Sequence, residues 1–182
     1  MSSRARQIAK TIEFEGGYSD HPADYGGATM CGITVPAWRN YVIATGQRER
    51  FNEPMRSLGR ADVEAFYGWW WDRPELGLAR LERPGSQFVV FDASVLSGRG
   101  RITRMVQGVV GVNQDGIIGP RTAAAVNAMG GAFVARMADA TEAWYRGIVA
   151  HDPSQGVFLN GWLNRNDERL AFAVELDKEN AE

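Results

Sequence analysis

Residues 86–97 constrain the fold most, because this segment is apolar on nearly every side. Its main exception is Asp92, which stands among apolar and a few small polar residues. A helix that is apolar all round is usually buried at the centre of a globular protein. The segment therefore predicts a centrally buried helix that carries one acidic side chain.

Helical spacing of apolar residues continues through most of the remaining chain. Thr34 and Pro36 indicate a helix start, and Gly46 a stop. Between residues 18 and 33, glycines and prolines indicate a loop or short hairpin, with Thr29–Ile33 as the best strand candidate. The fold class is therefore mostly α (α+β), with a small β-hairpin element and a helical C-terminal half. The other predicted helices span residues 4–14, 60–72, 102–109, 120–129, 133–149 and 158–178.

Bulk properties exclude several classes of protein. The net charge of −2 provides no basic surface for nucleic acid. Cys31 is the single cysteine, so no intrachain disulfide forms. No run approaches the ~18 apolar residues of a membrane span, and the N-terminus lacks the apolar core of a signal peptide. We therefore expect synthesis in the cytoplasm, no membrane insertion, and release or export where the substrate lies outside.

Glu15 is the candidate acid catalyst. It lies at the predicted C-terminal end of the first helix, where the helix dipole disfavours a carboxylate by ~0.3–1 kcal/mol. Burial against aromatic groups would raise its pKa further, as glycoside hydrolysis requires of a proton donor. Gly16 and Gly17 expose the backbone beside it, so a bulky sugar can approach. On spacing alone, a solvated glutamate at a helix end is the favoured interpretation.

Asp24 and Thr29 are candidate helpers of Glu15. Asp24 follows nine residues later, and its carboxylate would hold the nucleophilic water or stabilise an oxocarbenium ion. The Thr29 hydroxyl would position the same water. An aspartate before Tyr25-Gly26-Gly27 is more often a turn former, and that alternative stays open. Asp20 ranks below Asp24 as a second carboxylate.

Metal and cofactor chemistry finds little support in the sequence. Two histidines and one cysteine do not make a zinc site. Asp115 stands in a calcium-loop-like run, but regular oxygen ligands and a closing glutamate are absent, which favours a turn before a helix. Cys31 lacks a convincing partner as a nucleophile, and His21 fits a solvated loop. We expect no metal and no cofactor.

The run from Glu15 to Thr34 closely resembles the opening signature of glycoside hydrolase family 108. These are bacterial and phage N-acetylmuramidases, some described as secretion activators or endolysins. The resemblance implies that Glu15 is catalytic. A looser similarity to the Glu, Asp, Thr triad of phage-type lysozymes implies roles for Asp24 and Thr29, although the Asp-to-Thr interval is one residue shorter. The run departs from the family pattern at Tyr25, Met30 and Cys31, which flank the expected sugar groove.

Later segments extend the resemblance over nearly the whole chain. Asp115–Thr122 resembles a motif of peptidoglycan-binding modules. The weakest joint lies near Ser97–Arg101, so residues 1–98 are predicted as a muramidase region and 99–182 as a peptidoglycan-binding-like helical region, packed as one compact unit. Further segments that match the family are Tyr67 with Trp70-Trp71-Asp72, Phe91-Asp92 with Ser97-Gly98, and Gly161–Arg165.

The resemblance implies a lysozyme-like fold and cleavage of the β-1,4 bond between N-acetylmuramic acid and N-acetylglucosamine, with Glu15 as proton donor. The expected partner is the peptidoglycan glycan strand, met in the periplasm or cell wall by a monomer that a holin or a dedicated secretion system releases. Tyr18, Tyr25 and Trp71 are predicted to contact sugar, while Trp70 suits core packing, because consecutive residues on a helix point in different directions. A lytic transglycosylase, a chitinase and a non-catalytic wall-binding module stay as alternatives.

Overall fold

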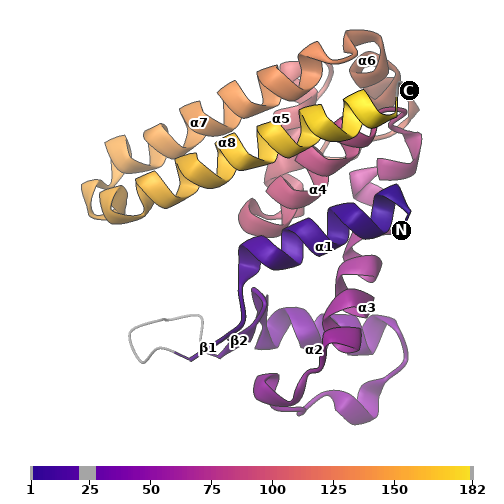
Figure 1. The fold of residues 1–182 in the computed structure, drawn as a ribbon, viewed down its shortest axis with the longest axis vertical. Coiled ribbons are helices and arrows are strands. Elements are labelled where there is room, and N and C mark those ends of the chain that lie inside the picture. Colours follow the sequence, from indigo (N-terminus) through magenta and orange to yellow (C-terminus); the bar gives the residue numbers. More distant parts are fainter. Residues whose placement is uncertain (1, 21–27, 181–182) are drawn as a thin grey trace. The chain divides into compact units, whose positions relative to one another are not determined.

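A computed structural model describes residues 2–20 and 28–180 and confirms the mostly α (α+β) class (Figure 1). The described strands form one small antiparallel sheet. No helix in the described part of the chain is long and apolar enough to cross a membrane. Internal contacts divide the chain into two compact units, Met1–Trp71 and Asp72–Glu182.

The first unit is built on three helices, α1 (Ser3–Glu15), α2 (Val35–Ala44) and α3 (Arg60–Trp71). Local signals set where two of them begin. The Ser2 side chain accepts a hydrogen bond from the backbone N–H of Ala5 at the start of α1. Thr34 caps α2 in the same way through the N–H of Ala37. Two short 3-10 helices, η1 (Arg48–Arg50) and η2 (Met55–Ser57), connect α2 to α3.

The sheet of the first unit has the order β1-β2-β3, with β1 at Tyr18–Ser19, β2 at Thr29–Met30 and β3 at Ile33–Thr34. The single predicted strand Thr29–Ile33 was therefore wrong in its extent. A turn at Cys31 and Gly32 divides it, so that Met30 pairs with Ile33. The predicted hairpin element is confirmed. Its β2–β3 turn lies within residues 29–33, which were predicted as one strand.

The second unit contains five longer helices that match the predicted ones within a few residues. Helices α7 and α8 run side by side as a long antiparallel pair (orange and yellow in Figure 1). Helix α4 packs against α5, α7 and α8, and the side chains of Phe88, Val90 and Phe91 are fully buried. The central burial predicted for residues 86–97 is confirmed. The bounds are α4 Pro84–Ser97, α5 Arg99–Val109, α6 Pro120–Met129, α7 Ala132–His151 and α8 Gly156–Glu179, with 3-10 helices η3 Pro74–Leu76, η4 Leu78–Arg80 and η5 Pro153–Gln155.

The compact units divide the chain earlier than the sequence-based regions do. Contacts place the boundary after Trp71, whereas the joint near Ser97–Arg101 falls between α4 and α5, which pack together in the second unit. Gly98, at φ +83°, makes this joint a tight corner between two packed helices. The functional division into residues 1–98 and 99–182 stays a prediction.

Asp92 is the polar centre of the second unit. Its carboxylate is fully buried and binds two guanidinium groups of α8, with Arg165 Nη2 at 2.9 Å from Oδ1 and Arg169 Nε at 2.6 Å from Oδ2. Burial raises the pKa of Asp92, but the two arginines outweigh that effect and hold the pKa below its ordinary value. The single acid in an otherwise apolar helix therefore fixes α4 against α8.

A second carboxylate of α8 sets the register at the start of α4. Asp177 accepts the backbone N–H of Gly85 at 2.8 Å and pairs with Arg83 Nε at 2.9 Å. A Cβ at Gly85 would collide with the Ala173 carbonyl oxygen and approach Asp177 Cγ to 2.8 Å. The two helices approach this closely because Gly85 has no side chain.

The run around Asp115 is a turn, as predicted. Asp115 Oδ1 accepts hydrogen bonds from the N–H of Ile117 at 2.9 Å and from Gln107 Nε2 at 2.6 Å. Gln107 Oε1 in turn accepts a hydrogen bond from the N–H of Gly116 in this turn. Hydrogen bonding, first from Gln107 and then from Ile117, lowers the pKa of Asp115. The carboxylate orders the segment before α6.

The substitution Asp92→Asn tests the buried triad of Asp92, Arg165 and Arg169. We expect the free energy of unfolding to fall by roughly 3–5 kcal/mol, because two guanidinium groups stay in the interior without their anion. Urea denaturation at pH 7 measures the change. Asp139→Asn, on the exposed face of α7, is the matched control and should stay within about 0.5 kcal/mol of the parent. A cost for Asp92→Asn no larger than that of the control would contradict the assignment.

The same triad predicts a pH dependence of stability. Because the folded-state pKa of Asp92 lies below its unfolded value, its contribution is fully present above about pH 4 and is lost as the pH falls through the folded pKa. Denaturation of the parent and of Asp92→Asn at pH 7 and pH 3 should therefore show a smaller stability gap at pH 3. A gap of equal size at both pH values would argue against this linkage.

Candidate active site

Glu15 is the last residue of α1, as the sequence predicts. Gly16 ends the helix at φ +74° and donates its N–H to the Glu13 carbonyl. The Glu15 side chain is partly buried, and its Oε1 atom is buried completely. A carboxyl group held at a helix C-terminus and partly removed from water is disfavoured as an anion. This environment suits a group that donates a proton.

The β2–β3 turn lies directly against the Glu15 carboxyl group. A Cβ added at Gly32 would collide with Glu15 Oε2 and stand 2.7 Å from Cδ. Gly32 also has φ +72°, a conformation that favours glycine. The carboxyl group is thus covered on one side by backbone that admits no side chain. In the sequence, Gly32 is one residue of the run from Glu15 to Thr34. A glycine in a two-residue hairpin turn is the signal for this role.

Cys31 precedes Gly32 in the turn and also has a positive φ, of 46°. Positive φ at both central residues is the pattern of a type I′ hairpin turn, and it is uncommon for cysteine. The surrounding structure holds it: the Cys31 N–H donates to the Gly17 carbonyl at 3.0 Å, and the buried Tyr67 hydroxyl donates to the Cys31 carbonyl at 2.6 Å. The turn is therefore fixed by Gly17, which directly precedes β1, and by Tyr67 of α3.

The Cys31 thiol lies close enough to Glu15 for the Glu15 charge to affect its pKa. Burial raises the pKa of Cys31, and the nearby Glu15 charge raises it further. The thiol is therefore kept protonated beside the carboxyl group.

The predicted helpers of Glu15 have different outcomes. Thr29 lies on β2, half-buried, opposite Ser19 and Thr34 and in the same hairpin that covers Glu15. Asp24 and Tyr25, like His21, lie outside the described residues. The catalytic roles of Asp24 and Thr29 stay predictions.

Tyr18 is exposed on β1, three residues after Glu15. Its hydroxyl donates to Asp20 Oδ2 at 3.0 Å, and this hydrogen bond raises the pKa of Tyr18. Its ring face is available to a ligand, with 44% of the residue exposed. Asp20 is engaged by this bond.

Trp71 is 7% exposed, and the Arg4 guanidinium carbon lies 5.9 Å from its ring centroid. Its predicted sugar contact stays a prediction, although little of the ring is open. Trp70 stacks on Phe66 with centroids 6.0 Å apart, as its predicted packing role requires. Trp69 joins the same aromatic cluster through Phe66 and Tyr41.

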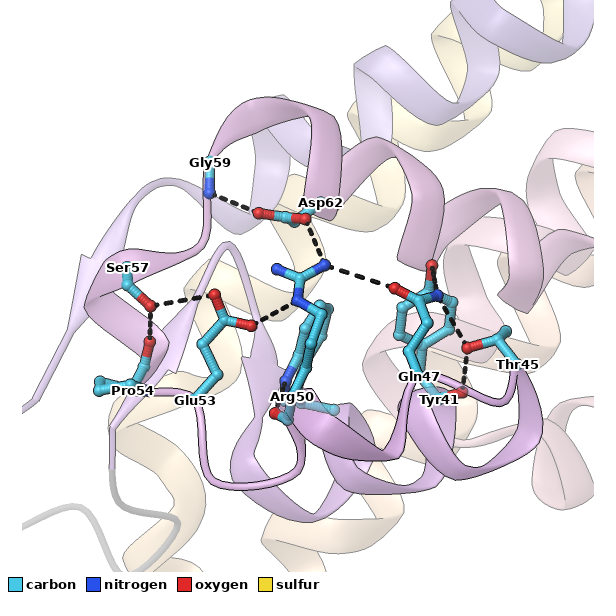
Figure 2. Close-up of polar contacts among 10 residues, drawn as sticks. Tyr41, Thr45, Gln47, Arg50, Glu53, Pro54, Ser57, Gly59 and Asp62 are labelled. Atoms are coloured by element: carbon cyan, nitrogen blue, oxygen red, sulfur yellow. Dashed lines mark hydrogen bonds and ion pairs between the residues drawn. The ribbon is translucent and has the colours of Figure 1, made fainter.

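An arginine-centred network supports the segment between α2 and α3 (Figure 2). Arg50 binds Glu53 through Nε at 2.6 Å and Asp62 through Nη1 at 2.8 Å. The hydrogen bonds that Arg50 donates to Glu53 and Asp62 raise the pKa of Arg50, and the bond from Arg50 lowers the pKa of Asp62. The guanidinium carbon also lies 4.9 Å from the centroid of the buried Trp38 ring. The network ties η1 to the start of α3.

The same segment forms one wall of a hollow of about 270 Å³ in the first unit. The other wall begins at β1, the strand that follows Glu15. The hollow is lined by Tyr18, Asp20, Ala28, Val35, Arg39, Phe51, Asn52, Glu53, Pro54, Met55 and Arg56. Its lining mixes aromatic, cationic, acidic and amide groups, a set that suits a sugar or a short peptide.

Comparison with known proteins decides the family. The model described as "Glycosyl hydrolase 108" matches residues 8–98, half of the chain. This chain belongs to the glycosyl hydrolase 108 family. A second model, described as "Predicted Peptidoglycan domain", matches residues 101–167. A solved structure titled "Structure of Brucella abortus SagA" is similar over 98% of both chains, with 30% sequence identity and a TM-score of 0.82. No curated protein matches.

Membership of the glycosyl hydrolase 108 family confirms the resemblance seen in the sequence and the lysozyme-like fold class. The protein is a glycoside hydrolase, and the two matched models together make it a lysozyme-like peptidoglycan hydrolase. The matched region of the hydrolase model contains α1, the sheet and the turn at Gly32. Gly32 and Cys31, which lie beside the Glu15 carboxyl group, therefore belong to the hydrolase region.

Gly32→Ala tests whether the turn positions Glu15. The added methyl group must displace the carboxyl group, and a displacement of about 1 Å can cost about 10²-fold in rate. We expect a loss of that order in the clearing of a cell-wall suspension. Gly46→Ala is the control, because Gly46 has φ +77° with open space around it. Both variants should lose roughly 1–2 kcal/mol of stability through the backbone, and equal activity in both would refute the positioning role.

Proposed function

We propose that this protein is an N-acetylmuramidase that hydrolyses the β-1,4 bond between N-acetylmuramic acid and N-acetylglucosamine, with Glu15 as general acid. One observation carries the proposal. The Glu15 carboxyl group ends α1 and is covered by the Gly32 backbone, in the segment matched to the hydrolase family. The next residues along the chain, Gly16 and Gly17, have open backbone: among the described residues no atom lies within 4 Å of a Cβ position there.

In the proposed reaction, Glu15 gives its proton to the glycosidic oxygen as the bond from that oxygen to the muramic acid C1 breaks. Water then adds its hydroxyl to C1, and its remaining proton restores the acid after exchange with solvent. The products are a muramic acid with a reducing end and an N-acetylglucosamine with a free hydroxyl. We assign the holding of the water to Asp24 and Thr29, following the sequence analysis.

Tyr18 is the best supported of the predicted sugar contacts. Its exposed ring stands on β1, three residues from Glu15 and at the edge of the 270 Å³ hollow. The hydrogen bond to Asp20 orients the ring. An aromatic side chain fixed in this way can pack on the apolar face of a sugar. We propose that it contacts the glycan strand beside the cleaved bond.

Peptidoglycan lies outside the cytoplasmic membrane, so we further propose that the protein acts there after release or export. Expression in a bacterial host with and without an inducible holin tests this part. Lysis should require both proteins. Lysis of the host by this protein alone at the same level would contradict holin-dependent release.

Glu15→Gln tests the general acid. Glutamine keeps the size of the side chain but has no acidic proton, so kcat for cell-wall hydrolysis should fall by at least about 10²-fold. Glu13→Gln is the matched control, because Glu13 lies on the same helix, is exposed and pairs with Lys10 on the surface. Circular dichroism and wall binding should be unchanged in both. Retained hydrolysis in Glu15→Gln would remove the central assignment.

The products test the reaction type. Digested cell wall should release fragments that end in reducing N-acetylmuramic acid, as mass spectrometry and borohydride reduction detect. A lytic transglycosylase would use the same glutamate without water and release 1,6-anhydro ends. Reducing N-acetylglucosamine ends would place the cut at the other bond of the strand. Either of the last two results would refute the muramidase proposal.

A further inference from the structure

The 270 Å³ hollow is lined by two arginines. Arg39 comes from α2 and Arg56 from η2. Arg50 and Arg60 nearby are each paired with carboxylates. Within residues 2–20 and 28–180, neither Arg39 nor Arg56 forms an ion pair. The hollow therefore presents two cations without a protein anion in the described structure.

Arg39 is held in place by contacts other than charge pairing. Its Nε donates to the Phe51 carbonyl at 3.3 Å, and its Nη2 donates to Asn52 Oδ1 at 3.4 Å. The guanidinium carbon lies 4.7 Å from the Phe51 ring centroid. A guanidinium fixed in this way loses little conformational entropy when it binds an anion. Arg56 lies close enough for its charge to act on the Tyr18 hydroxyl across the hollow.

The two carboxylates of the hollow are already engaged by other groups. Glu53 accepts from Arg50 Nε at 2.6 Å and from the Ser57 hydroxyl at 3.4 Å (Figure 2). Asp20 accepts the Tyr18 hydroxyl at 3.0 Å. Their acceptor capacity is partly used, whereas Arg56 has no anionic partner among residues 2–20 and 28–180. The hollow is thus prepared for a ligand that carries carboxylates.

Peptidoglycan supplies such groups in one place. Its amino sugars are uncharged in the intact polymer, and its carboxylates lie on the short peptide attached to the lactyl group of muramic acid. Tyr18 is three residues from Glu15, so their Cα atoms are at most about 11 Å apart. The peptide of the muramic acid at the cleaved bond is therefore within reach of the hollow.

We propose that this hollow is a subsite for the carboxylate-bearing stem peptide of peptidoglycan, with Arg39 and Arg56 as the carboxylate-binding residues. The inference rests on the proposed muramidase function. Guanidinium groups bind carboxylates through paired, charge-assisted hydrogen bonds, which provide both affinity and orientation. The subsite makes the enzyme select strands that carry peptide over bare amino-sugar polymers such as chitin.

Binding in the absence of turnover gives the first test. The Glu15→Gln protein is titrated by calorimetry with N-acetylmuramyl-L-alanyl-D-glutamate. Adding Arg56→Ala should weaken binding about tenfold, the loss expected for one charge-assisted hydrogen bond. Arg48→Ala is the control, because Arg48 is exposed in the same segment and does not line the hollow. Equal affinity in the two arginine variants, or no binding by Glu15→Gln itself, would overturn the subsite.

Activity gives the second test and separates the two proposals. Arg56→Ala should lower kcat/KM about tenfold on intact strands, and leave unchanged the cleavage of strands stripped by an amidase, which keep only the lactyl carboxylate. Arg39→Gln should show the same pattern. A loss of equal size on both substrates would overturn the stem-peptide assignment while leaving the muramidase proposal intact. Failure of the parent protein to cleave either substrate would instead refute the muramidase proposal.

Discussion

The contact between the Glu15 carboxyl group and the backbone of Gly32 is the constraint on which the candidate site depends. It requires three separate elements to be in place. Helix α1 must end at Glu15, the β2–β3 turn must hold both Cys31 and Gly32 at positive φ, and α3 must supply the Tyr67 hydroxyl that binds the turn. The contact therefore forms only when these elements are folded together.

The second unit uses charge in a different way. Asp92 and its two arginine partners, Arg165 and Arg169, lie between α4 and α8. A buried ion pair stabilises little more than a well-packed apolar group of similar volume, but it penalises every misaligned pairing of the two helices. We therefore regard the triad as a device that fixes the register of α4 and α8, together with Asp177 and Gly85.

Most of the fold was predictable, because helix ends depend on a few neighbouring residues. Thr34 and Pro120 mark starts that the structure keeps, and residues 86–97 are as buried as their composition requires. The prediction of one strand over Thr29–Ile33 was wrong because the apolar pattern continues across the turn at Cys31 and Gly32. Cysteine rarely takes positive φ, and Cys31 does so here because Gly17 and Tyr67 bind its backbone from outside the segment.

The sequence by itself determined the helices, the family and the choice of Glu15, because these follow from local spacing and from a motif read along the chain. Only the tertiary structure decided that Gly32 covers Glu15 and that Trp71 is buried. It also decided that Arg39 and Arg56 line a hollow, whereas Arg50 forms ion pairs with carboxylates. These facts depend on residues that are distant in sequence and adjacent in space. A pattern of neighbours along the chain does not show whether an arginine meets a carboxylate or leaves its donors for a ligand.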